Sequence, residues 1–365
     1  MPNRIFLTGA TGFIGSGVLQ DWLVHEPDTE ISILVRARRG ADPQTRARRL
    51  LQDILLSPEA YSDRISIVEG DISLARFGIS DSAYQDLTDR TAHIIHCAAA
   101  VRFDLPLEEA RAINVAGSQN VLALGRRCRN LRRLDYVGTA YIAGRRTGIL
   151  KEDELDLGQQ HNNTYEKTKL ESELLMREAM TDLPITIHRP SIVICDSRTG
   201  RISAYSAFFR MLKAYNLGRL SALPGDPSTL LDLVPMDYVA GLIREIALRP
   251  DNLGKCFHLT AGPENLTPLS LVAQLASQHF GRAPFAIVTP EVFEAAVRKR
   301  DTQLTEEERD LIGEIAIYRP YLSASPRFDN SNVRTLLGPS YAPPPPLASY
   351  FQKMAAYIIA GTQSP

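Results

Sequence analysis

A glycine-rich turn close to the first residue constrains the fold more than any other feature of this sequence. It spans residues 7–16 and lies between an apolar run, Ile5–Leu7, and an amphipathic run at helical spacing, Phe13–Leu23. Its three glycines fit the dinucleotide-binding fingerprint, because they permit a tight turn, a close approach of the backbone to a pyrophosphate and close packing of the helix on the strand. Free amides at the start of the helix then face the phosphates. The residues of the turn expected to bind the cofactor are Gly9, Thr11, Gly12, Phe13, Ile14 and Gly15.

Composition limits the class of protein. The chain has 365 residues, enough for two or three domain-sized units, with 44% hydrophobic and 23% charged residues and a formal net charge of -1. These values are typical of a globular protein and argue against a general nucleic-acid binder. The first residues lead straight into the first predicted strand, no apolar stretch is long enough to cross a bilayer, and the four cysteines form no CxxC pair. We therefore expect a cytoplasmic protein without a membrane span, a zinc site or a disulfide framework.

The residue that follows the second predicted strand indicates which dinucleotide binds. An NAD enzyme would carry an acidic residue after the strand Ile31–Val35, where it hydrogen-bonds the ribose, but this chain has Arg36. A guanidinium pairs well with a phosphate. We therefore predict NADPH, with Arg36 on its 2′-phosphate and Arg46 as a second candidate. The alternative is a solvated basic loop, which is the interpretation we favour for Arg48 and Arg49.

Three further apolar runs, Ile65–Val68, Ala92–His96 and Leu134–Gly138, predict strands of the same sheet. Strands that alternate with helical patterns indicate a doubly wound parallel α/β sheet of the Rossmann type. Small residues after the fourth strand would let the backbone approach the dinucleotide. The histidines of that strand, His93 and His96, have no visible metal partner and are predicted to be structural. The small residues are Ala98, Ala99 and Ala100.

A tyrosine and a lysine four residues apart form the predicted catalytic centre. Tyr165 and Lys169 share one face of a helix that opens near Asn162, and Thr139 follows the fifth strand. A nearby ammonium favours the phenolate, which makes a tyrosine a better proton donor and acceptor at neutral pH. Thr139 can hydrogen-bond the same substrate oxygen and stabilise its developing charge. We expect Tyr165 to act as general acid, and Lys169 also to hold the nicotinamide ribose.

Five phrases of the sequence together resemble one branch of the extended short-chain dehydrogenases. This branch, of the male-sterility NAD-binding type, contains the thioester reductases and fatty acyl-CoA reductases, and the resemblance covers about residues 1–260. Its members use NADPH to reduce an acyl thioester, on coenzyme A or on the phosphopantetheine arm of a carrier protein, to an aldehyde or, after a second round, an alcohol. The phrases are Thr8–Gly15, Leu34–Ala37, His96–Ala99, Val137–Tyr141 and Asn163–Glu166.

The resemblance also implies further cofactor contacts. Asp71 stands where relatives accept a hydrogen bond from the adenine amino group, and the next residue, Ile72, would pack on that ring. Asn114, on a helix expected from Leu107 to about Arg129, would lie near the cofactor. The turn at Pro190, with Ile192 and Val193, would pack beside the nicotinamide.

The chain is expected to divide into two functional parts. Residues 1–200, completed by 229–262, would form the Rossmann domain that binds NADP, and 201–228 with 263–365 a smaller, mostly helical lobe that binds substrate. Helices are predicted over 203–217, Glu291–Arg300, Thr305–Ile317 and Leu347–Ile359, with a capping box at Thr305. The apolar stripe of 203–217 is more typical of a core than of an acyl pocket.

The sequence therefore predicts an NADPH-dependent acyl thioester reductase, with two alternatives. One is a ketone or carbonyl reductase, or a sterol-type or sugar-nucleotide dehydrogenase or epimerase of the same family. The other is an NADPH sensor without catalysis, although such a protein has no need of Thr139, Tyr165 and Lys169. No oligomeric state is predicted. A basic cluster is considered as a docking surface for an acidic carrier protein; its members are Arg126, Arg127, Arg129, Arg132 and Arg133.

Overall fold

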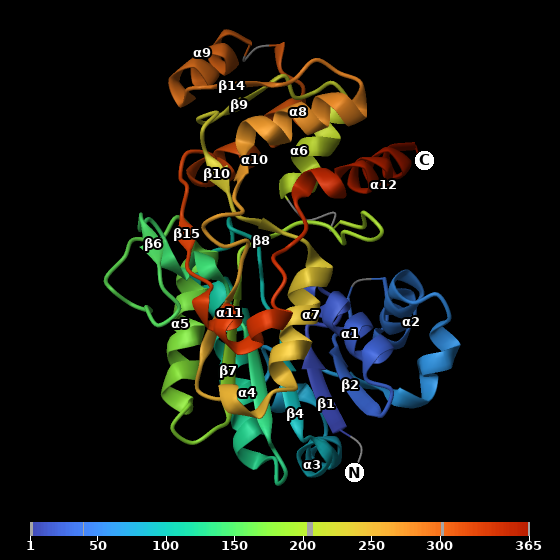
Figure 1. Ribbon diagram of the computed structural model, residues 1–365. Helices are drawn as coiled ribbons and strands as arrows, with labels where there is room; N and C mark the ends of the chain where they lie inside the picture. The colour runs from blue at the N-terminus through green and yellow to red at the C-terminus, as the bar shows by residue number, and fades with distance from the viewer. Residues whose placement is uncertain (1–2, 39, 203–206, 301–302, 364–365) are drawn as a thin grey trace.

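A seven-stranded parallel sheet forms the centre of the molecule, in the order β12-β7-β5-β4-β1-β2-β3 (Figure 1). The structure is a computed structural model, and it describes residues 3–38, 40–202, 207–300 and 303–363. The predicted doubly wound α/β fold is confirmed. The strands of the sheet are β1 (Asn3–Thr8), β2 (Thr29–Val35), β3 (Ile65–Glu69), β4 (His93–His96), β5 (Arg133–Val137), β7 (Ile185–Pro190) and β12 (Cys256–Leu259).

Helices cover both faces of this sheet. On one face α1 packs against α7, and Trp22, Val239 and Ile243 belong to the shared core; on the other α4 packs against α5, with Leu122 and Met176 in the core. Strands buried on both faces need nearly continuous apolar sequence, which is why runs such as Ile31–Val35 could be recognised. These helices are α1 (Phe13–His25), α2 (Pro43–Ile54), α3 (Asp81–Arg90), α4 (Leu107–Arg127), α5 (Thr164–Ala179), α7 (Met236–Ala247) and α11 (Ser331–Leu337).

The sheet order reverses at β1, which lies between β2 and β4. Crossovers run to one side of β1 through β2 and β3, and to the other through β4, β5 and β7. In open parallel sheets, ligands bind outside the carboxyl ends of the strands at such a switch point. The fold therefore directs the turn after β1 and the loop after β4 toward one common edge.

A second group of helices forms a lobe beside the carboxyl edge of the sheet, drawn above it in Figure 1. It has a core of its own, which includes Phe208, Leu212 and Tyr215, so the apolar stripe is core as predicted. Residues 203–206 of the predicted helix lie outside the described residues. The helices of the lobe are α6 (Ala207–Asn216), α8 (Leu269–Phe280), α9 (Pro290–Arg300), α10 (Glu306–Leu322) and α12 (Phe351–Gln363).

Short two-stranded pairs complete the chain. They are β6 (Ile149–Leu150) with β15 (Arg327–Phe328), β8 (Ile192–Val193) with β11 (Leu233–Val234), β9 (Ala222–Pro224) with β14 (Ala286–Val288), and β10 (Leu230–Leu231) with β13 (Thr267–Pro268). The β8–β11 pair follows directly on β7, so it extends the sheet edge toward the lobe. None of the described helices is both long and apolar enough to cross a membrane.

Two helix boundaries differ from the prediction. The capping box is present, since Thr305 and Glu308 exchange hydrogen bonds, but α10 continues past the predicted end to Leu322. Pro320 lies within its last turn, where the helix tolerates it. The closing helix begins at Phe351, because Tyr350 has a non-helical backbone that separates it from the turn at 347–349.

Candidate functional site

The turn after β1 requires glycine at two positions. Gly9 has a φ of +78°, and a Cβ there would lie 2.5 Å from the backbone nitrogen of Ala98. A Cβ at Gly15 would lie 2.1 Å from the carbonyl oxygen of Gly9. No side chain fits either place, so helix α1 starts directly against the turn and the loop after β4 lies against it. The predicted residues of both loops thus form one surface of bare backbone.

A histidine holds these two loops together. The Thr8 hydroxyl lies 2.8 Å from His96 Nδ1, and the Ala98 amide donates to the same hydroxyl at 3.3 Å. Burial lowers the pKa of His96 to about 3, so its imidazole is neutral at physiological pH. His93 instead bonds to Asp135 at 2.6 Å. Both histidines are structural, as predicted, and the described residues contain no cluster that could hold a metal ion.

The loop after β4 is braced by Asn114. Its side-chain oxygen accepts from the Ala100 amide at 2.7 Å, and its nitrogen donates to the Thr168 hydroxyl at 2.9 Å. Asn114 is buried, and these bonds fasten the 98–100 segment to helix α5. The predicted position of Asn114 at this edge is thus matched by a supporting contact to the loop.

Two arginines lie near the glycine turn: Arg36 follows β2, and Arg46 lies at the start of α2. Arg46 donates to the Arg36 carbonyl and, at 3.2 Å, to the Thr11 hydroxyl. Arg36 lies 3.6 Å from Asp71 and is half exposed. Burial opposes ionisation of Asp71, but hydrogen bonds from Ser73 and the charge of Arg36 outweigh it and lower the pKa of that carboxyl. The side chains predicted for the adenosine end therefore form one connected group.

The predicted catalytic residues meet at the carboxyl ends of β5 and β7. The Thr139 hydroxyl lies close enough to Tyr165 to lower the pKa of its phenol, and it donates weakly to the Pro190 carbonyl at 3.5 Å. Lys169 donates to the Val137 carbonyl at 2.8 Å. Beyond Pro190, Ile192 and Val193 form β8, so the turn assigned to the nicotinamide lies beside Thr139.

The electrostatics of this centre differ from the expectation in one respect. Burial raises the pKa of Tyr165 to about 12, although the bond with Thr139 lowers it. Burial also lowers the pKa of Lys169 to about 8, and the nearby carboxylate of Glu173 opposes that shift. The expected stabilisation of the Tyr165 phenolate by Lys169 is therefore outweighed, because the amine bonds to Val137 and desolvation dominates both groups.

Aromatic residues surround the phenol, and the sequence analysis missed them. The ring of Phe103 stacks on Tyr165 at 5.5 Å between centroids, and it also lies against Tyr318 and Tyr321 of α10. Phe103 could have been suspected, because it follows the small-residue segment at the end of β4. No local signal pointed to Tyr318 or Tyr321, which lie about 150 residues after Tyr165 in the chain.

The basic cluster is not one open surface, and the docking hypothesis is wrong for Arg133. That side chain is buried and forms a bidentate salt bridge with Asp135. Arg133 and Asp135 are two apart on one strand and so share a face, a signal that was available. Arg126 pairs with Asp182 at 2.7 Å and Arg129 with Asp89 at 3.2 Å, so acidic neighbours already offset part of the remaining charge.

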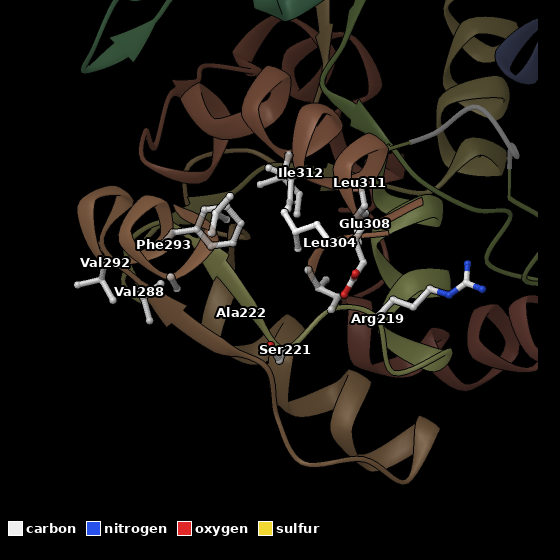
Figure 2. A pocket seen from close by; sticks show the side chains of 14 residues that line it. Arg219, Ser221, Ala222, Val288, Val292, Phe293, Leu304, Glu308, Leu311 and Ile312 are labelled. Carbon is white, nitrogen blue, oxygen red and sulfur yellow. The ribbon is translucent and has the colours of Figure 1, made fainter. Parts of the chain in front are cut away.

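A cavity of about 170 Å³ lies in the lobe and not beside Tyr165. It is enclosed by β9, β14, α9 and α10, and its walls are mostly apolar. Figure 2 shows Phe293, Leu304 and Ile312 lining it, with Arg219 and Glu308 at the rim.

Comparison with known proteins supplies the family. Residues 7–243, more than half of the chain, match the family model described as male sterility protein, an NAD-binding model. The chain belongs to the male sterility protein family. Its NAD-binding domain contains the glycine turn and all three predicted catalytic residues. A nicotinamide dinucleotide is therefore the cofactor class of this domain.

Proteins of three different kinds are similar to this member of the male sterility family. A putative fatty acyl-CoA reductase of Drosophila melanogaster is 30% identical over 310 residues, 74% of this chain, and the chain spans 56% of that protein. The crystal structure of the terminal R domain from the myxalamid PKS-NRPS biosynthetic pathway matches with a TM-score of 0.85 and 27% identity, over 99% of this chain and 91% of that one. UDP-glucuronic acid 4-epimerase from Bacillus cereus shares the fold, with a TM-score of 0.71 and 20% identity over 98% and 99% of the two chains.

Proposed function

We propose that the chain is an NADPH-dependent reductase of acyl thioesters that yields an aldehyde or, after a second round, an alcohol. The acyl group would arrive on coenzyme A or on a carrier protein. The observation that carries the proposal is the meeting of Thr139, Tyr165 and Lys169 at the edge that also holds the glycine turn: the Thr139 hydroxyl lowers the pKa of the Tyr165 phenol, and Lys169, one helical turn away, donates to the Val137 carbonyl. The relatives named as fatty acyl-CoA reductase and as R domain of a biosynthetic pathway support this substrate class.

The residues present fit a phosphorylated dinucleotide. At Gly9 the backbone lies so close to the Ala98 backbone that a Cβ would be 2.5 Å from it, which leaves amides and not side chains facing the pyrophosphate. No acidic side chain follows β2. Arg46 donates to Thr11 and to the Arg36 carbonyl, Arg36 lies beside Asp71, and the two guanidinium groups would bind a 2′-phosphate.

Side chains of the protein itself account for orienting the carbonyl, stabilising its developing charge and transferring the proton. When bound, the cofactor supplies a hydride to the carbonyl carbon. The hydroxyls of Thr139 and Tyr165 orient the carbonyl oxygen and stabilise its developing negative charge. Tyr165 gives its proton to that oxygen, which yields a hemithioacetal. When its hydroxyl returns the proton to the phenolate, the carbon–sulfur bond breaks, the aldehyde is released, and the thiolate takes up a proton from water to leave as the thiol. Lys169, held by the Val137 carbonyl, would anchor the ribose and keep a positive charge near the phenol.

The lobe, residues 201–228 and 263–365, is proposed to bind the acyl group. Helix α10 of this lobe lies against Phe103, the ring that stacks on Tyr165, which supports a role of the lobe in binding the substrate. The alternative as ketone reductase is tested by the same assay as the main proposal.

The test follows NADPH oxidation with panels of acyl-coenzyme A, acyl-carrier protein, aldehydes and ketones, and identifies the products. We expect turnover of a thioester with release of free thiol. Tyr165→Phe should lower kcat by about 10²- to 10⁴-fold, the range of a general acid, and leave NADPH binding intact. Turnover of ketones alone would overturn the thioester assignment, and full activity of Tyr165→Phe would overturn the role of the phenol.

A further inference from the structure

The lobe contacts the first turn of the catalytic helix through one hydroxyl. Tyr321, in the last turn of α10, accepts a hydrogen bond from Asn163 Nδ2 at 2.7 Å and donates to a carboxylate oxygen of Glu166. These two partners stand on either side of Tyr165 in the sequence. A single side chain from a distant element therefore holds both residues that flank the proposed proton donor.

The same two partners determine where α5 begins. Asn163 is the N-cap, and its side-chain oxygen accepts from the Glu166 amide at 3.0 Å. The Glu166 carboxylate is fully buried and also accepts from the Asn162 amide at 2.7 Å. A buried carboxylate without a cation depends on every donor around it. Loss of the Tyr321 hydroxyl would therefore loosen the turn that carries Tyr165.

The phenol itself is held from two sides. The Thr139 hydroxyl lies beside it and lowers its pKa, and its ring stacks on Phe103 with an angle of 19° between the planes. Phe103 in turn lies 5.6 Å from the Tyr321 ring, and its loop is fastened to α5 by the Thr164 hydroxyl, which donates to the Leu105 carbonyl at 2.9 Å. Tyr321 therefore acts on the Tyr165 phenol in two ways: its ring contacts Phe103, which stacks on the phenol, and its hydroxyl bonds to Asn163 and Glu166.

We propose that Tyr321 is a positioning residue for the reduction, and that the lobe sets the Tyr165 phenol through it. The inference rests on the proposed function, in which that phenol protonates the substrate oxygen. Small displacements of a proton donor matter, since a shift of about 1 Å can cost about 10²-fold in rate. The lobe then contributes to the chemical step in addition to binding the acyl group.

The matched pair of variants is Tyr321→Phe and Tyr318→Phe. Both remove one hydroxyl from α10 and keep the ring, but the charged neighbour of the Tyr318 hydroxyl is Arg210, and among the described residues this hydroxyl has no hydrogen bond to α5. With octanoyl-coenzyme A and octanal as substrates, Tyr321→Phe should lower kcat about tenfold, the loss expected for one buried hydrogen bond. KM and the Kd for NADPH should stay within about twofold, and the solvent deuterium isotope effect on kcat should rise because proton transfer slows. Tyr318→Phe should match the wild type.

A second variant separates positioning from folding. Phe103→Leu keeps apolar volume beside the phenol but removes the stacking ring, and it should also lower kcat with unchanged NADPH binding. Thermal unfolding of all variants is measured alongside. An active wild type with unaffected Tyr321→Phe and Phe103→Leu overturns the positioning role alone. A wild type that reduces no member of the acyl-coenzyme A, acyl-carrier protein and aldehyde panels overturns the proposed function, and the positioning role falls with it.

Discussion

At the scale of single residues, the proposed preference for NADPH is tested at Arg36. Arg36→Ala should weaken NADPH binding about 10- to 100-fold, the worth of a hydrogen bond to a charged group, and leave NADH binding nearly unchanged. Fluorescence titration with each dinucleotide measures both constants. Arg38→Ala is the matched control, because this exposed side chain lies in the same loop but is not assigned to the phosphate, so it should alter neither constant. Equal losses for NADPH and NADH in Arg36→Ala would refute the assignment.

Lys169 should give the enzyme an alkaline limit. Burial lowers the pKa of its ammonium from 10.5 to about 8, so the group is charged below pH 8 and becomes neutral as the pH rises through that value. If the positive charge supports ribose binding and proton donation, kcat/KM should fall above about pH 8, since this constant reports the free enzyme. Lys167→Met, which alters an exposed lysine two residues away, should keep the same limit. A profile that stays flat to pH 10 would contradict the role.

The catalytic trio and its neighbours show what sequence could and could not predict about the site. Tyr165 and Lys169 are related by helix periodicity, and Thr139 by its place at a strand end, so local rules suffice to bring them together. The ring of Phe103 reaches Tyr165, and the hydroxyl of Tyr321 reaches Asn163 and Glu166, only through tertiary packing, which no local pattern records. The pKa of Tyr165 was mispredicted for the same reason, because burial depends on the whole surroundings.

At the scale of elements, strand β5 depends on a buried anion. Asp135 accepts from Arg133 and from the Nε2 atoms of His93 and His188, each at 2.6 Å, and these charges and donors hold its pKa well below the usual value despite burial. Asp135→Asn should lower the free energy of unfolding by about 3–5 kcal/mol, because the buried guanidinium loses its counter-charge.

Urea unfolding measures that loss, and Asp86→Asn is the control. Asp86 pairs with Arg90 at 3.6 Å on the exposed side of α3, where such a pair is worth about 0.2–1 kcal/mol. An Asp135→Asn variant as stable as Asp86→Asn would show that the histidines alone satisfy the site.

The elements themselves were predictable to different degrees. Strands of the parallel sheet are apolar on both faces and stand out from their surroundings, as Ile31–Val35 does. Helix α10 was recognised by its capping box, but its last turn was not, because Pro320 is a helix breaker in most contexts and is tolerated here. That unpredicted turn carries Tyr318 and Tyr321, so the error in a boundary also hid part of the site.

At the scale of the whole molecule, one carboxylate joins three distant segments. Glu152 accepts from the His258 amide of β12 and from the Asn332 amide of α11, each at 2.7 Å. Burial raises the pKa of Glu152 to about 7, although these two bonds oppose the shift. Between about pH 4.5 and 7 the Glu152 carboxyl therefore holds a proton in the folded chain, whereas the same carboxyl has released its proton in the unfolded chain. This contribution to stability is complete below pH 4.5 and is lost as the pH rises through 7.

Glu152→Gln should remove this dependence on pH. Between pH 5 and 7 the free energy of unfolding of the wild type should fall by about 1.4 kcal/mol per pH unit relative to Glu152→Gln, the slope for one proton. Urea unfolding of both proteins across that range measures the difference in slope, which does not depend on the constant cost of the amide. Glu154→Gln is the control, since hydrogen bonds to Lys151 and Arg146 lower the pKa of that carboxyl and place its titration below this range. Parallel curves for the wild type and Glu152→Gln would show that the Glu152 carboxyl is ionised in the folded chain. The three segments would then be joined by a carboxylate and not by a protonated carboxyl group.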